Sequence, residues 1–167
     1  MSPAGLCNFG TVTPWLAVGT PTAGKPTTVE DGAQSAGATV NIQCAVTAVG
    51  SGFDVLLKVA LEGSQGGSVT ISSPTGQGAV TASGGTVSGS FESASLGDYS
   101  SNSCTISYTY QGGPVPDSPT VADGRIWGHL SCPAAQNTGS TVLTPDGGKS
   151  ALTCDGEADF LFENCGQ

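Results

Sequence analysis

Basic side chains are scarce in this sequence, and their scarcity is the first absence that narrows its function. Of 167 residues, four are Lys or Arg and thirteen are Asp or Glu, so the formal net charge is −9. Phosphate contacts need clustered Lys and Arg, so neither nucleic acid nor an anionic membrane surface is expected as a partner. Charged residues make up 10% of the chain, against roughly 25% in a typical soluble domain. Its polarity therefore comes from Ser, Thr, Gly, Asn and Gln.

Long apolar runs and helical patterns are absent as well. No run approaches the roughly 18 apolar residues that a membrane span requires, so we predict no transmembrane segment. No window of useful length places apolar residues at helical spacing, because 26 glycines and 10 prolines interrupt the candidates. These absences disfavour a helical fold and favour short strands joined by tight turns.

A period of two in hydrophobicity begins at residue 38. A strand is predicted at residues 40–49, where Val40, Ile42 and Val46 alternate with mostly polar neighbours. Residues 53–62 repeat the pattern after a glycine-rich turn, which predicts a hairpin. Further strands are predicted at residues 68–73, 78–82, 85–92, 103–110, 124–132, 150–153 and 157–164. Strands at this spacing indicate an all-β fold, a two-sheet sandwich or jelly roll, with a closed β-barrel as the alternative.

The first 37 residues differ in composition from the rest. They are rich in Pro, Thr and Gly, and we predict an extended N-terminal arm over residues 1–37, followed by a single β-sandwich domain over residues 38–167. One early strand is expected near residues 8–13. The arm either docks on its own domain or adds to the sheet edge of a second copy, which is a route to self-association.

Six cysteines suggest a disulfide framework. Their number is even, no C-x-x-C pair occurs, and a single histidine cannot complete a zinc finger. We expect three disulfides that cross-link the fold. Disulfides form in an oxidising compartment, so we expect the protein in the medium, at the cell surface or in the bacterial envelope. The predicted pairs are Cys7–Cys44, Cys104–Cys132 and Cys154–Cys165. No export signal is visible, and the bulky Leu6 before Cys7 does not fit a lipid-anchor cleavage site.

The strongest candidate for ligand binding is a face that carries an aromatic side chain. Alternation places Arg125, Trp127 and His129 on one side of a predicted strand, with Ile126 and Leu130 on the core side. An exposed Trp beside polar groups can stack on a sugar ring, so a glycan is one candidate ligand. The alternative is a Trp packed beneath the N-terminal arm.

Catalysis by a serine triad is not expected. His129 is the single histidine, and no G-x-S-x-G motif accompanies it. No pair of carboxylates stands out among the thirteen acids as a glycosidase pair. We therefore predict that the chain is not an enzyme, with a small secreted hydrolase as the least favoured alternative.

Acidic residues near the C-terminus form the second candidate site. Asp155, Glu157 and Asp159 follow one another at a spacing of two, so an extended backbone places them on one face. Carboxylate oxygens are the ligands that calcium prefers, so calcium is the one candidate ion. No other cofactor is expected. The alternative is a solvated outer face, opposite Ala158, Phe160 and Phe162.

Residues 125–133 (RIWGHLSCP), residues 160–165 (FLFENC) and the segment around Cys104 (SCTISYTY) resemble small exported β-rich proteins and lipoproteins of myxobacterial type. The resemblance covers roughly residues 85–167, and its motifs are strands and cysteines. It implies an envelope or extracellular location and a β-rich fold, and it assigns no catalytic or binding residue.

These observations predict a secreted or cell-surface structural or adhesive module, not an enzyme, that is able to self-assemble. A carbohydrate-binding module is the alternative.

Overall fold

The computed structural model describes residues 2–6, 13–14, 18, 24–35, 37–63, 66–93, 97–139 and 153–166. Throughout these ranges the chain forms strands and turns, and none of it forms a helix long and apolar enough to cross a membrane. The strands are β1 (Ser2–Leu6), β2 (Thr13–Pro14), β3 (Gln34–Ser35), β4 (Ala38–Val49), β5 (Gly52–Glu62), β6 (Gly67–Ser72), β7 (Val80–Thr81), β8 (Gly84–Ser93), β9 (Gly97–Ser107), β10 (Thr109–Tyr110), β11 (Gly113–Pro114), β12 (Val121–Ala122), β13 (Arg125–Asn137) and β14 (Thr153–Phe162).

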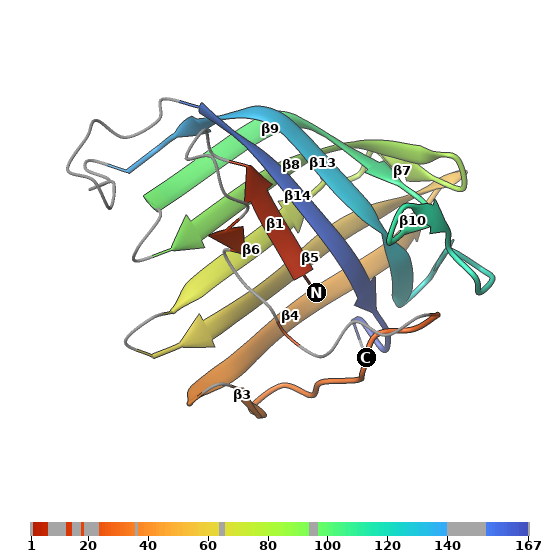
Figure 1. The fold of residues 1–167 in the computed structure, drawn as a ribbon. Helices are drawn as coiled ribbons and strands as arrows, with labels where there is room; N and C mark the ends of the chain where they lie inside the picture. Colours follow the sequence, from red (N-terminus) through yellow and green to blue (C-terminus); the bar gives the residue numbers. More distant parts are fainter. Residues whose placement is uncertain are drawn as a thin grey trace.

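One antiparallel sheet contains most of these strands. Its order is β2-β1-β14-β13-β9-β8-β6-β5-β4-β3, with β12 beside β13 and with β7 beside β5 and β8; β10 and β11 form a separate hairpin. The sheet curls into two layers, so that β1, β13 and β14 lie across β4, β5 and β6 (Figure 1). The predicted all-β, sandwich-like fold is confirmed. Within the described residues the terminal strands β2 and β3 do not pair, so the alternative of a closed barrel is not formed.

The core lies between the two layers. Alternate residues of the long strands face inward because every second side chain of a strand points to the same side. Phe91 of β8 and Phe160 of β14 are among the buried core side chains. Gly156 of β14 faces Phe91 so closely that an added Cβ would lie 2.4 Å from the Phe91 ring. The two layers therefore touch at this point, and a residue larger than glycine would push them apart.

Two disulfides are described, and they correct the predicted pairing. Cys104 and Cys132 are bonded, as predicted, and join β9 to β13. Cys44 is bonded to Cys165 and not to Cys7, so the pairs Cys7–Cys44 and Cys154–Cys165 are wrong. Cys154 lies at the start of β14 and Cys165 beyond its end, and a ten-residue strand spans roughly 33 Å, far beyond the reach of one disulfide. Cys154 is itself disulfide-bonded, and Cys7 lies outside the described residues.

Parts of residues 1–37 take a place in the sheet. β1 pairs with β14 over five residues, from Ser2 opposite Asp159 to Leu6 opposite Asp155, and β3 pairs with β4. The side chain of Val18 is 5% exposed and belongs to the core. The early strand predicted at residues 8–13 lies outside the described residues apart from Thr13, which is in β2.

The free side of β4 is covered by other parts of the chain. The backbone N–H of Ile42 donates to the Asp31 carboxylate at 2.7 Å, and that of Ala48 donates to Asp123 at 3.3 Å. The N–H of Gly124 donates to the carbonyl of Val46 at 2.8 Å. An exposed strand edge invites pairing with another chain, and these contacts occupy part of this edge.

Candidate functional site

Trp127 does not form the exposed aromatic platform that the sequence predicts. Its side chain is 1% exposed and packs edge-on against Tyr110, with ring centroids 5.4 Å apart. Tyr110 belongs to the β10–β11 hairpin, which lies against the outer side of β13 and covers the indole. The indole N–H is buried and has no hydrogen-bond partner among the described residues. The predicted exposure of Trp127 is therefore wrong, because the β10–β11 hairpin covers the outer face at this position.

Arg125 is held by contacts within the domain. Its guanidinium lies 3.1 Å from the Asp117 carboxylate and 3.4 Å from that of Glu163, and it also donates to the carbonyl of Pro119. Lys25 binds Glu163 from the other side at 3.3 Å. These ion pairs join the turn before β12 to the end of β14, so the Arg125 charge is already compensated.

His129 pairs with Asp159 across β13 and β14. The two residues are directly opposite in register, and the imidazole Nδ1 lies 3.0 Å from the carboxylate oxygen. The hydrogen bond with Asp159 raises the pKa of the His129 imidazole, burial opposes it, and the charges of Asp159 and Glu157 support it. The sequence offers no signal for this pair, because thirty residues separate its members.

A serine completes a row with this pair but is not hydrogen-bonded to it. Ser107 of β9 lies opposite His129, so serine, histidine and carboxylate occupy three neighbouring strands. The Ser107 hydroxyl lies 3.2 Å from that of Thr109, and the structure describes no hydrogen bond between Ser107 and His129. A serine hydrolase needs that bond in order to activate its nucleophile. The row as it stands supports a structural reading of the His129–Asp159 pair.

The acidic face predicted on β14 exists, and two of its members have internal partners. Asp155, Glu157 and Asp159 point outward, while Cys154, Gly156, Ala158 and Phe160 point to the core. Asp155 accepts a hydrogen bond of 2.8 Å from the N–H of Ala134, at the point where the β13–β14 register shifts by a bulge. Within the described ranges no group of three or more His, Cys, Asp or Glu side chains is placed to hold a metal ion. Calcium binding by these three residues stays a prediction without a formed site.

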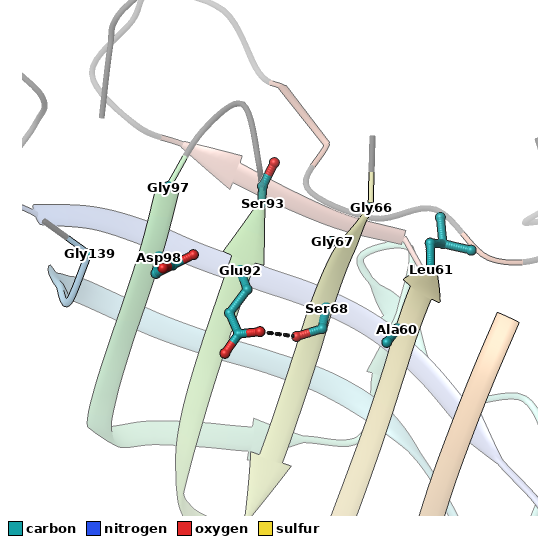
Figure 2. Close-up of a pocket in the computed structure, with 10 residues that line it drawn as sticks. All are labelled: Ala60, Leu61, Gly66, Gly67, Ser68, Glu92, Ser93, Gly97, Asp98 and Gly139. Atoms are coloured by element: carbon teal, nitrogen blue, oxygen red, sulfur yellow. Dashed lines mark hydrogen bonds between the residues drawn. The ribbon is translucent and has the colours of Figure 1, made fainter. Parts of the chain in front are cut away.

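A cavity that the sequence does not reveal opens at the ends of β5, β6, β8 and β9. Its volume is about 450 Å³. Figure 2 shows the side chains of Ser68, Glu92 and Asp98 beside one another on consecutive strands. The register accounts for this row, because Ser68 is opposite Glu92, and Glu92 is opposite Asp98. The remaining lining is mostly glycine and other small residues: Ala60, Leu61, Gly66, Gly67, Ser93, Gly97 and Gly139.

Ser68 orients one of the two carboxylates in this cavity. Its hydroxyl donates to Glu92 at 2.8 Å, and it is the one buried polar side chain in the part of the chain that the structure describes. No ion pair in the described part of the chain involves Glu92 or Asp98. Like charges directly opposite each other on a sheet are destabilising, so this arrangement needs an explanation other than stability.

The sequence contains a weak signal for this cavity, which the strand prediction misses. Residues 94–96 separate β8 from β9, and pairing across so short a connection brings Glu92 opposite Asp98. The predicted strand begins only at residue 103, because a bulge in β9 breaks the alternation between Tyr99 and Cys104.

A second cavity of about 440 Å³ lies beneath residues 26–31, between β4, β5 and the end of β14. Its lining includes Ile42, Val59, Phe162 and Cys44, and Cys44 is disulfide-bonded to Cys165. Acidic residues at its rim are Glu30, Asp31 and Glu163, and Glu163 is already paired with Lys25 and Arg125. The described residues that line this cavity therefore include no basic side chain that could bind an anionic ligand.

The fold and these contacts define an all-β, disulfide-linked domain whose predicted site residues mostly serve its own structure. No protein-family model, no curated protein and no solved structure matches the chain.

Proposed function

We propose that this chain is a non-enzymatic, secreted or cell-surface module with a structural or adhesive role. The observation that carries the proposal is the fate of the six side chains from which a site is predicted. Arg125, Trp127, His129, Asp155 and Asp159 all contact other parts of the domain, and the charge of Glu157 acts on His129. Side chains that serve a site are expected to face a ligand.

Disulfides support the proposed location. Cys44 and Cys165 are 121 residues apart in sequence, so their bond closes almost the whole domain into one loop. By the chain-entropy estimate such a loop contributes about 5 kcal/mol to stability. Disulfides of this kind form and persist outside the cytosol, and the resemblance to exported proteins of myxobacterial type points to the same location.

Self-assembly is part of the proposal and would proceed through β1. This five-residue strand lies between β14 and the two-residue β2. A short strand that pairs with one long strand can be exchanged between identical copies at low cost. The covered edge at β4 makes β14 the better acceptor.

Surface labelling tests the location, and sedimentation tests assembly. Antibodies against the folded domain should label intact cells of the source organism or detect the protein in its medium. Recovery from the cytosol alone would overturn the proposal. Analytical ultracentrifugation of the full chain over a wide concentration range should show dimers or longer assemblies. A strictly monomeric chain at the highest concentration would remove self-assembly from the proposal and leave the structural role.

A further inference from the structure

The outer side of the layer that contains β4, β5, β6, β8 and β9 is rich in polar side chains and is here called the polar face. Cross-strand register sets its side chains in three rows. The rows are Asn41–Ala60–Ser68–Glu92–Asp98, Gln43–Lys58–Thr70–Ser90–Ser100 and Ala45–Leu56–Ser72–Ser88, the last continued by Asn102 through a hydrogen bond of 3.2 Å from Ser88. The cavity with Ser68, Glu92 and Asp98 lies at one end of the first row.

Small hydroxyl and amide side chains dominate the polar face. These short side chains do not project far from the sheet. Neighbouring strands lie about 4.8 Å apart, so hydrogen-bond donors and acceptors recur at short, regular intervals. The core row Val59–Val69–Phe91–Tyr99 lies directly behind this surface and is buried, which holds it rigid. A rigid polar surface can bind an extended ligand without ordering its own side chains first.

The carboxylates of the polar face select against anionic ligands. Glu92 and Asp98 repel an anion at the cavity, and Lys58 in the middle row is a single positive charge against their two negative ones. Large apolar ligands have little to contact, since Leu56 is the one exposed large hydrophobic side chain of the described chain, at 47% exposure. A neutral ligand with many hydroxyl groups fits the remaining chemistry.

The cavity has the size and the acceptors for one unit of such a ligand. Its volume of about 450 Å³ falls within the roughly 300–1,000 Å³ of small-molecule sites. Two adjacent carboxylates accept hydrogen bonds from neighbouring hydroxyl groups, and bonds to a charged acceptor are about twice as strong as neutral ones. Gly139 forms part of the wall beside Asp98, where an added Cβ would lie 3.3 Å from the carboxylate.

We propose that the polar face binds a neutral polysaccharide, with one sugar unit in the cavity hydrogen-bonded to Glu92 and Asp98. The proposal rests on the adhesive role argued above and gives that role a ligand class and a surface. It moves the carbohydrate site from Trp127, which is buried, to the opposite layer of the domain. Leu56 would contact the C–H groups of a sugar unit further along the same polysaccharide chain.

Binding to insoluble neutral polysaccharides tests the proposal. The full, oxidised chain is mixed with cellulose, chitin and purified cell-wall polysaccharide, and the unbound fraction is measured in low and high salt. The wild type should bind at least one of these, with little effect of salt. The variant Glu92→Gln with Asp98→Ala keeps an acceptor for Ser68 and should bind at least tenfold more weakly. Ser90→Arg, which obstructs the middle row, should also weaken binding.

Glu157→Ala provides the matched control, because it removes a carboxylate from the outer side of β14 and should leave binding unchanged. Urea unfolding of every variant checks that weaker binding does not come from unfolding. Failure of the wild type to bind, or equal binding by the cavity variant, overturns the proposal. So does binding that a chelator abolishes or that favours a cationic polymer. If surface labelling succeeds while polysaccharide binding fails, the structural role stands and only this ligand is wrong.

Discussion

The two outer faces of the domain use charge in opposite ways. On the β13–β14 face, which carries Arg125, Trp127, His129, Asp155, Glu157 and Asp159, most polar groups have internal partners. On the polar face, Glu92 and Asp98 stand opposite each other with no cation paired to them in the described residues. The first arrangement stabilises the fold, and the second works against it. The difference teaches that the residues singled out from the sequence mostly contact their own domain, whereas Glu92 and Asp98, which no motif marks, have no paired cation in the described residues.

The largest difference between the faces is expected at Trp127. Replacing it with Ala removes a fully buried ring, which should lower the free energy of unfolding by about 3–5 kcal/mol. Thr70→Ala on the polar face should change it by no more than about 0.5 kcal/mol. Urea titration followed by circular dichroism measures both.

Trp127→Phe sharpens the same comparison. Because the indole N–H has no hydrogen-bond partner in the part of the chain that the structure describes, Phe loses ring volume but no hydrogen bond, and it should cost less than half as much as Ala. A Trp127→Ala variant as stable as Thr70→Ala would show that Trp127 is exposed in solution, and the contrast between the faces would fail.

Regular alternation makes part of the fold predictable. β4 and β5 have no bulge between them, so the predicted strands at residues 40–49 and 53–62 differ from the observed bounds by at most two residues. The sequence predicts two strands, at residues 150–153 and 157–164, where the structure has β14 over Thr153–Phe162, and Gly156 lies between the two predictions. Its lack of a side chain instead admits the ring of Phe91 from the other layer, a contact that no local pattern could show.

The candidate site is less predictable for the same reason. Alternation assigns Trp127 to a face but does not reveal the hairpin that covers that face. Phase along the strands places Cys44 and Cys132 inward, yet the partner of Cys44 depends on how the sheet curls. Glu92 and Asp98 carry no motif, and only the register of β8 and β9 brings them together.

A smaller effect is expected at the His129–Asp159 pair, and it should depend on pH. The pKa of folded His129 is raised above its usual value of 6.5, so its contribution is fully present below the unfolded pKa and is lost as pH rises through the folded pKa. For a partly exposed pair we expect about 0.5–1 kcal/mol.

The stability difference between wild type and His129→Gln checks this contribution. Unfolding at pH steps from about 5.5 to 9 should give a difference that shrinks toward high pH. Asp159→Asn should behave like His129→Gln, since either change removes the charged pair. A difference that is constant over this range, or that grows with pH, would contradict the assigned sign.

The smallest change in stability is expected where the charge is least compensated. Glu92→Gln with Asp98→Asn removes two like charges that face each other and keeps an oxygen for the Ser68 hydroxyl. Relief of repulsion should leave the free energy of unfolding unchanged or raise it by a few tenths of a kcal/mol, within the roughly 0.2–1 kcal/mol of a cross-strand pair. Asp159→Asn, the matched change on the other face, should lower it. If the double variant is instead destabilised as much as Asp159→Asn, the two carboxylates have a structural partner within the domain. Their proposed role in binding a ligand would then be wrong.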